Sequence, residues 1–193
     1  MMDKKSNIIP WSNAYTTHRV NLQDSIPLDV PLCVCIEPTN VCNFKCLMCW
    51  QSTDEYKHNG GPFFNMDMDL FHKILTDIQD LCEKTRTKIK LVKLYSTGEP
   101  FLHPEIAKMV QQIKEADICN QVEITTNGAL LTKDMAESFV RAGLDYLRVS
   151  IYSVLPERQA AVTKSNVSPK QIFDNIQYLK KYRLMNANKS FID

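Results

Sequence analysis

The sequence predicts an α/β fold, specifically a partial, open TIM-like barrel of parallel strand and helix repeats. Two observations point to it. From about residue 31 onward, short apolar runs alternate with longer amphipathic runs, which is the pattern of parallel strands joined by helices. The chain has 193 residues, whereas a closed eight-stranded barrel typically needs about 250. We therefore expect four strand and helix units and a barrel truncated after its fourth helix.

Residues 1–30 and 31–193 differ in pattern, and we expect an N-terminal extension followed by one core domain. The first thirty residues are polar and aperiodic, and they contain no apolar stretch long enough for a signal sequence or a membrane span. This predicts a cytoplasmic protein that does not use a membrane. Lysine and arginine number 23 against 22 acidic residues, without a dense basic run, so nucleic acid is not indicated as a partner.

Four apolar runs are the predicted strands. The first ends at Pro38, because proline cannot continue a strand ladder. A polar turn segment, TGEP or TTNG, closes the second and third runs. The predicted strands are residues 32–38, 89–96 and 146–152, with residues 122–128 as the third strand and its turn, and residues 190–193 are the expected opening of a fifth.

Four amphipathic runs are the predicted helices, at residues 69–82, 103–116, 131–143 and from 168 onward. Asp67 or Asp69 is the expected N-cap of the first, and Pro104 suits the first turn of the second. Thr132 should cap the third, which Gly143 should end. The predicted core faces consist of Leu70, Phe71, Ile74, Leu75, Ile78, Leu81 and Cys82, then Ile106, Met109, Val110 and Ile113, then Ile172, Phe173, Ile176 and Leu179.

Three of the seven cysteines, Cys42, Cys46 and Cys49, lie in the stretch VCNFKCLMCW, directly after the first predicted strand. Disulfides are uncommon in a reducing compartment, so clustered cysteines favour a metal site. An iron–sulfur cubane normally takes four thiolates, and three would leave one iron open to a chelating ligand. The alternative is a structural zinc site with Cys33, Cys35 or His58 as fourth ligand.

Other chemically capable residues favour plainer interpretations. Cys33 and Cys35 share one strand face with Glu37, and buried inert thiols are the favoured interpretation there. Cys82 is expected in the core, and Cys119 is expected just before a strand. Arg148 lies in a strand whose faces the sequence does not distinguish; if it points inward, it would suit an anionic group.

The stretch CIEPTNVCNFKCLMCW closely resembles the cluster loop of the radical S-adenosylmethionine (radical SAM) enzymes. The resemblance continues through LYSTGEPFLHPE, which is similar to the family's Gly-Gly-Glu-Pro segment, and through EITTNG and LDYLRVSIYS. The segment AAVTKSNVSPKQIFDNIQYLKKYR looks like the helix found in members with an added SPASM-type domain carrying auxiliary clusters. One departure is Thr97, which stands where the family has its first glycine.

The resemblance implies two cofactors, a [4Fe-4S] cluster and S-adenosylmethionine. It implies that Cys42, Cys46 and Cys49 hold the cluster. The residues that it implies as S-adenosylmethionine contacts are Met48, Gly98, Glu99, Thr126 and Ser150. No general acid or base is assigned.

The function that the resemblance implies is reductive cleavage of S-adenosylmethionine to a 5'-deoxyadenosyl radical, which takes hydrogen from a substrate. It implies an electron donor such as flavodoxin or ferredoxin, and a peptide or small-molecule substrate that the sequence does not identify. The alternative is a non-enzymatic metal-binding module, with zinc or an electron-transfer iron–sulfur centre.

Overall fold

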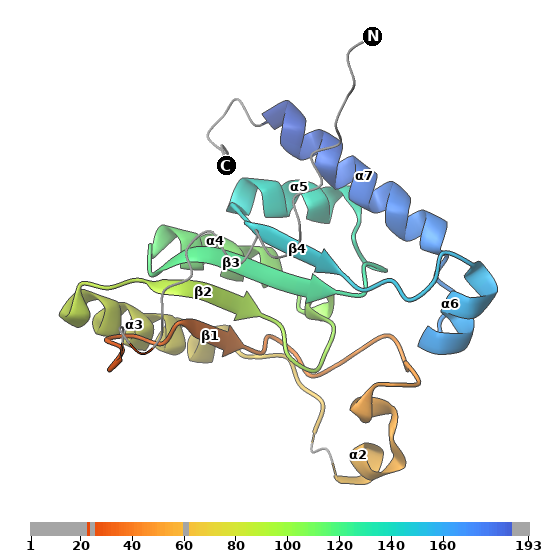
Figure 1. Cartoon of the computed structure of the whole chain (residues 1–193), viewed down its shortest axis with the longest axis horizontal. Coiled ribbons are helices and arrows are strands. Elements are labelled where there is room, and N and C mark those ends of the chain that lie inside the picture. The colour runs from red at the N-terminus through yellow and green to blue at the C-terminus, as the bar shows by residue number, and fades with distance from the viewer. Residues whose placement is uncertain (1–22, 24–25, 60–61, 187–193) are drawn as a thin grey trace.

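A four-stranded parallel sheet organises the chain. In this computed structural model, residues 23, 26–59 and 62–186 are described. The strands are β1 (Cys33–Ile36), β2 (Ile89–Leu94), β3 (Cys119–Thr126) and β4 (Tyr146–Val149). They lie in the order β1-β2-β3-β4 and every neighbouring pair is parallel, so their C-terminal ends share one edge (Figure 1). The predicted α/β fold is confirmed. Most of the expected N-terminal extension at residues 1–30, namely residues 1–22, 24 and 25, lies outside the described residues, as does the expected fifth strand at 190–193.

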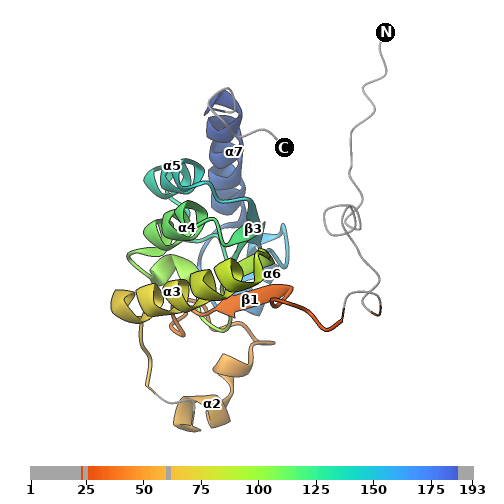
Figure 2. The same cartoon turned by 90° about the vertical axis from the view of Figure 1, so that its left-hand side faces the viewer.

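Three helices cover one face of the sheet. They are α3 (Met68–Thr85), α4 (Ile106–Glu115) and α5 (Lys133–Ala142), which Figure 2 shows stacked on one side of the strands. A fourth helix, α7 (Pro169–Asn186), packs against α5. The shorter elements are η2 (Trp50–Ser52), α2 (Asp54–Asn59), η3 (Pro100–Leu102) and α6 (Pro156–Thr163).

The core lies between the sheet and these helices. Alternate strand residues point to the helices, because successive side chains of a strand leave opposite faces. The buried strand residues on this face include Ile36, Val92, Leu94, Val122 and Ile124. They meet the helix residues Phe71, Met109, Ile113 and Phe139, which are also buried. The intervening strand residues therefore face away from the helices.

The predicted caps and core faces are largely confirmed, with three exceptions. Asp67 caps α3, Thr132 caps α5, and Gly143 ends α5 with a φ of 81°. The core positions predicted for α4 are all buried. The exceptions are Leu70, Leu81 and Phe173, which are 50%, 37% and 40% exposed. A helix lying on a sheet buries only the stripe that faces it, so apolar residues at the margins stay in water.

Several predicted boundaries are wrong. Pro104 precedes α4, whose N-cap is Glu105, and Cys119 begins β3 rather than preceding it. At the C-terminal edge, β2 stops at Leu94 and β4 at Val149, earlier than predicted, because the chain there turns into loops that leave the ladder. The helices α2 and α6 were not predicted; both are short and only weakly patterned. In the described part of the chain, none of the helices has the length and apolar character needed to span a bilayer.

Candidate functional site

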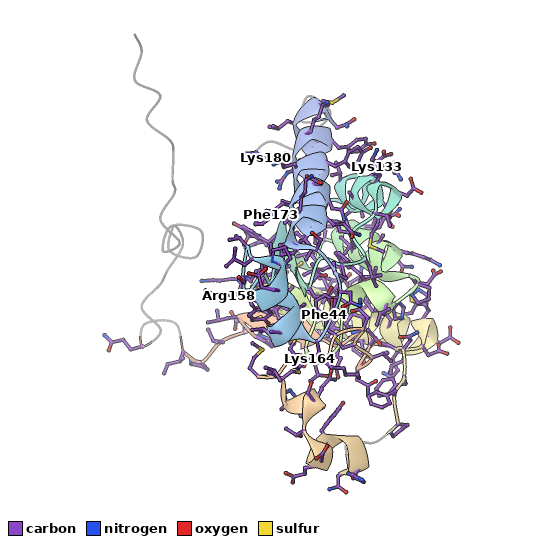
Figure 3. The ribbon with its side chains drawn as sticks, turned by 90° about the vertical axis from the view of Figure 1, so that its right-hand side faces the viewer. Phe44, Lys133, Arg158, Lys164, Phe173 and Lys180 are labelled. Carbon is purple, nitrogen blue, oxygen red and sulfur yellow. The ribbon has the colours of Figure 1, made fainter. Side chains whose placement is uncertain are left out.

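The cysteine loop is held at the C-terminal edge of the sheet by backbone hydrogen bonds to α6. The Lys45 amide donates to the Thr163 carbonyl (3.1 Å), and the Leu47 amide donates to the Val162 carbonyl (2.9 Å). Carbonyls in the last turn of a helix have no partner within the helix, so the loop supplies the missing donors. Phe44 is buried beside α6 in the same region (Figure 3). The sequence pattern does not predict this support, because α6 is short and only weakly amphipathic.

The three cysteines of the loop line one cavity of about 270 Å³. The other lining residues come from the loop and from the ends of β2, β3 and β4: Phe44, Met48, Tyr95, Ser96, Gly98, Glu99, Thr125, Thr126, Asn127, Ser150 and Tyr152. All eight residues that the sequence predicted as cluster or cofactor contacts line this cavity: the three cysteines together with Met48, Gly98, Glu99, Thr126 and Ser150. The fold thus brings together segments separated by more than a hundred residues.

Gly98 is required for the close packing of two loops. A Cβ atom built on Gly98 would lie 2.2 Å from the Thr39 carbonyl oxygen and 2.7 Å from that of Val41, both of which are backbone atoms. The neighbouring Glu99 amide donates to the same Val41 carbonyl (2.8 Å). The close backbone approach at Gly98 is therefore made by the Thr39–Val41 segment of the same chain. This contact holds the residues just before Cys42 in position.

The Glu99 carboxylate is buried, at 2% exposure, and accepts three hydrogen bonds. Oε1 accepts from the Thr126 hydroxyl (2.6 Å) and the Phe101 amide (3.1 Å), and Oε2 accepts from the Asn127 amide (2.7 Å). Burial raises the pKa of this carboxyl, although the three donors oppose the rise. Because its oxygens are engaged with the end of β3 and with η3, Glu99 has a structural role that the sequence did not predict.

Thr97, the departure from the family pattern, has its own partner. Its amide donates to Glu37 Oε1 (2.8 Å), and its hydroxyl contacts the same oxygen. Glu37 follows β1 directly, so this pair joins the ends of β1 and β2. A glycine would keep the amide contact but lose the hydroxyl contact.

Asn127 joins the cysteine loop to β3. Its side-chain amide donates to the Asn43 side-chain oxygen (2.7 Å), and Asn43 directly follows Cys42. The Thr126 hydroxyl donates to Glu99 and accepts from the Gly128 amide (3.0 Å), so its one donor and one of its two lone pairs are used within the chain. The turn pair Asn-Gly was visible in the sequence, whereas the contact with Asn43 depends on tertiary structure.

The segment that follows β4 lines the remaining side of the cavity. Ser150 lies just beyond the strand, not within it as predicted, and its amide donates to the Thr126 carbonyl (2.9 Å). Tyr152, which the sequence did not single out, lines the cavity; burial and then the nearby Cys46 thiol raise the pKa of its phenol. The fully buried Gln159 fixes this segment, because its Oε1 accepts from the Tyr152 and Ser153 amides (3.0 Å each).

The donor set of three thiols fits a soft metal centre. Burial raises the pKa of Cys42 and of Cys46, and for Cys46 the next cause is the neighbouring Cys42 thiol, so the sulfur atoms are close enough to interact. In the described ranges, no three His, Cys, Asp or Glu side chains converge as ligands of a single metal ion. The three thiols line one shared cavity, and thiolates are the ligands that hold iron–sulfur clusters.

The proposed extra ligands of a zinc site lie elsewhere. Cys33 and Cys35 are on β1, outside the cavity lining. The His58 ring nitrogen Nδ1 is 2.6 Å from the Asp54 carbonyl oxygen within α2.

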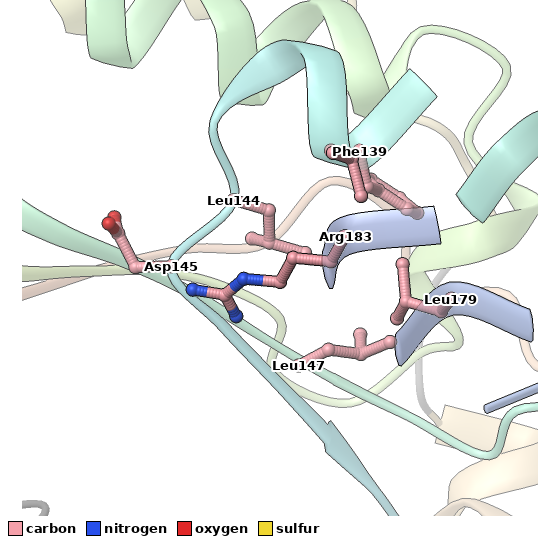
Figure 4. A pocket seen from close by; sticks show the side chains of 7 residues that line it. Phe139, Leu144, Asp145, Leu147, Leu179 and Arg183 are labelled. Carbon is pink, nitrogen blue, oxygen red and sulfur yellow. The ribbon is translucent and has the colours of Figure 1, made fainter. Parts of the chain in front are cut away.

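A second cavity, of about 40 Å³, lies between α5, β4 and α7 (Figure 4), and its lining contains no cysteine.

A family model described as the radical SAM superfamily matches residues 36–193 of the chain. The chain is 33% identical over 148 residues to the tungsten-containing aldehyde ferredoxin oxidoreductase cofactor-modifying protein of Pyrococcus furiosus. The matched region covers 77% of this chain and 38% of that protein. It is 31% identical over 144 residues to the GTP 3',8-cyclase of Lactiplantibacillus plantarum, covering 74% and 40%. The chain thus spans about two fifths of the length of these curated relatives.

Two solved structures share the fold. Streptococcus suis SuiB bound to the precursor peptide SuiA gives a TM-score of 0.61 at 20% identity, covering 83% of this chain and 33% of that one. BtrN in complex with AdoMet and 2-DOIA gives a TM-score of 0.55 at 20% identity, covering 69% and 50%. These likenesses support the open, partial barrel.

Replacing Glu99 by alanine should destabilise the protein even without any cofactor. Two buried donors and one half-buried donor would lose their acceptor, and the loss of a buried one costs about 1–3 kcal/mol, so we expect the free energy of unfolding to fall by about 3 kcal/mol. Urea denaturation of the cofactor-free protein measures this. Glu105→Ala is the control, because Glu105 is paired with Lys108 near the surface and its loss should cost about 0–1 kcal/mol. Equal stability of Glu99→Ala and wild type would contradict the structural role.

Replacing Gly98 by alanine should force the two loops apart. The added Cβ meets two backbone oxygens that no side-chain rotation can move, and overpacking of this kind costs about 1–3 kcal/mol or more. Urea denaturation should show the loss, and Ser96→Ala, two residues earlier in the same cavity wall, should not. A Gly98→Ala protein as stable as Ser96→Ala would contradict the close packing.

Proposed function

The chain belongs to the radical SAM superfamily, whose enzymes use a [4Fe-4S] cluster and S-adenosylmethionine, and on this premise we propose that it is the core of a radical SAM oxidoreductase. One observation carries the proposal. Three thiols from one short loop line a single cavity at the C-terminal edge of a parallel sheet, the edge at which such folds bind ligands. Because the chain spans only part of its relatives, the proposal concerns the activity of the whole protein.

In this proposal Cys42, Cys46 and Cys49 hold the cluster as thiolates and leave one iron free for S-adenosylmethionine. The bound cofactors would supply the chemistry, which is reductive cleavage to a 5'-deoxyadenosyl radical that abstracts hydrogen from the substrate. The thiols must lose their protons on binding, and because burial raises the pKa of Cys42 and of Cys46, assembly should be favoured at higher pH. The chain itself supplies no general acid or base in this proposal.

The cofactor wall consists of the five other predicted contacts, Met48, Gly98, Glu99, Thr126 and Ser150, all of which line the cavity. We assign them two kinds of role. Met48 and Ser150 offer a thioether and a hydroxyl to a ligand. Gly98, Glu99 and Thr126 act mainly by holding the loops in position, since their polar groups are engaged within the chain. A rigid wall of this kind would limit the entry of water to a reactive intermediate.

The substrate would approach over the sheet face that α3, α4 and α5 leave uncovered. Arg148 lies on this face, and its guanidinium pairs with the buried Glu123 carboxylate (3.1 Å). The Tyr95 hydroxyl donates to the same carboxylate (2.8 Å), and Lys93 lies in register with Glu123. Lys93, Arg148 and Glu123 thus place two cations and one carboxylate on the sheet face beside the cavity. This net positive surface favours a substrate that carries a polar or anionic group.

The proposed partners are an electron donor such as flavodoxin or ferredoxin and a peptide or small-molecule substrate. The similar proteins do not choose between the two substrate classes, because a GTP 3',8-cyclase is named for a nucleotide and SuiB is bound to a peptide. We propose a cytoplasmic location, which is consistent with seven cysteines that are all free. Auxiliary clusters of the SPASM type stay a prediction.

Anaerobic reconstitution with iron and sulfide tests the proposal. We expect a brown protein with about four irons per chain that releases 5'-deoxyadenosine from S-adenosylmethionine when dithionite is added. Cys42→Ala, Cys46→Ala and Cys49→Ala should each lose the cluster absorbance and reduce 5'-deoxyadenosine to background. Cys82→Ala, on the core face of α3, is the matched control and should keep both. A colourless protein with one zinc per chain would instead support the non-enzymatic metal module.

A further inference from the structure

Two cysteines outside the cluster loop lie on the uncovered face of the sheet. Cys33 and Cys35 are two residues apart in β1, so their side chains leave the same face, and Val34 between them packs toward the core. Both are exposed and free, contrary to the buried, inert thiols expected from the sequence. Exposure of two neighbouring thiols needs an explanation, because free cysteine is among the most buried residue types.

The pair adjoins the wall of the cysteine cavity. The Cys35 thiol donates to the Tyr95 carbonyl (2.8 Å), and Tyr95 lines the cavity. Cys35 also lies in register with Lys93, and Cys33 with Leu91 one step farther from the C-terminal edge. Of the two thiols, Cys35 is therefore the nearer to the site, and Cys33 lies behind it along the same strand face.

Both thiols are expected to carry their protons at neutral pH. Partial desolvation of the sulfur atoms by neighbouring groups raises the pKa of Cys33 and of Cys35, and for Cys35 the next cause is the Cys33 thiol. The Lys93 ammonium opposes the rise for both, while Glu123 adds to it for Cys33 and Glu37 adds to it for Cys35. A protonated thiol is a poor nucleophile and a poor metal ligand, because both roles need the thiolate. The S–H bond remains, and it is weaker than an alkyl C–H bond.

We propose that Cys35 and Cys33 form a hydrogen-atom donor pair that quenches a carbon-centred radical on the uncovered face of the sheet. The inference rests on the proposed radical chemistry of the neighbouring site. A C–H bond forms on the radical carbon as the Cys35 S–H bond breaks homolytically, which leaves a thiyl radical on Cys35. The Cys35 thiyl radical can then take a hydrogen atom from the Cys33 thiol. One S–H bond breaks as an equivalent S–H bond forms, and the thiyl radical moves to Cys33, farther from the substrate.

The electron balance needs only the reductant that the proposed function already uses. One electron from that low-potential donor and one proton from solvent return the thiyl radical to a thiol. The substrate that gives up a hydrogen atom thus receives one back, without net oxidation. The class of reaction implied is a rearrangement or an inversion at carbon, in contrast to a desaturation.

Deuterium tracing tests the donor pair without knowledge of the substrate. Without substrate, the 5'-deoxyadenosyl radical is itself the carbon-centred radical that the pair has to quench. Thiol hydrogens exchange with solvent, so reconstituted protein in D₂O, given S-adenosylmethionine and dithionite alone, should form 5'-deoxyadenosine that carries one deuterium. Cys35→Ala should still form 5'-deoxyadenosine but lose the label. Cys33→Ala should keep the label, because Cys35 remains the first donor, and the core variant Cys82→Ala should behave as wild type.

The outcomes separate the two proposals. Unlabelled 5'-deoxyadenosine from the wild type, or the same label in wild type and Cys35→Ala, would overturn the donor pair and leave the proposed function standing. Absence of any 5'-deoxyadenosine would count against the proposed function, and with it against the donor pair that rests on it.

A second readout uses the cofactor-free protein. Native alkylation at pH 8 with iodoacetamide, followed by peptide mass spectrometry, should modify Cys33 and Cys35 at least about tenfold faster than Cys82 and Cys119, because access limits buried thiols. Cys119 is the stricter control, since burial raises its pKa to about 11. Equal rates at all four positions would mean that the uncovered face is closed to small molecules, and would overturn the inference.

Discussion

The buried Glu99 carboxylate is the interaction on which the site depends. It stands at the end of β2 and accepts hydrogen bonds from the end of β3 and from η3, while its own amide holds the chain just before Cys42. Without it, three loops that leave three different strand ends would have no common anchor. Burial makes the ionised carboxylate costly, and the three donors offset that cost, so the anchor is stable only when all of the loops are in place.

A second support comes from the opposite side of the cysteine loop. The last carbonyls of α6 accept amides of the loop, and the buried Gln159 in the same helix fixes the segment that carries Tyr152. The loop is thereby held between the sheet edge and a helix that is more than a hundred residues away in the sequence. Two independent supports explain how a short, polar loop can keep three thiols around one cavity without regular secondary structure.

The uncovered face of the sheet differs chemically from the covered face. The covered face is aliphatic and aromatic, as a core must be. The uncovered face carries Lys93, Glu123 and Arg148 together with two free thiols. Because strand side chains alternate, one short strand can supply the core with one set of residues and the site with the other. This division lets the same four strands determine both stability and, in our proposal, the handling of substrate and radical.

The sequence alone determined the parallel α/β fold, the core of α4, the caps of α5 and the three-cysteine loop, because these follow from periodicity, capping chemistry and spacing within short segments. The expected resemblance to the radical SAM enzymes is confirmed by the family match. The eight predicted site residues do line one cavity, although their roles as ligands stay proposals. Tertiary structure decided what local patterns do not encode: that Glu99 and Gly98 act as packing anchors, that α6 supports the loop, and that Cys33 and Cys35 are exposed. The physical reason is that burial and hydrogen-bond partners depend on residues distant in the chain, which meet only when parallel strands bring their C-terminal ends to one edge.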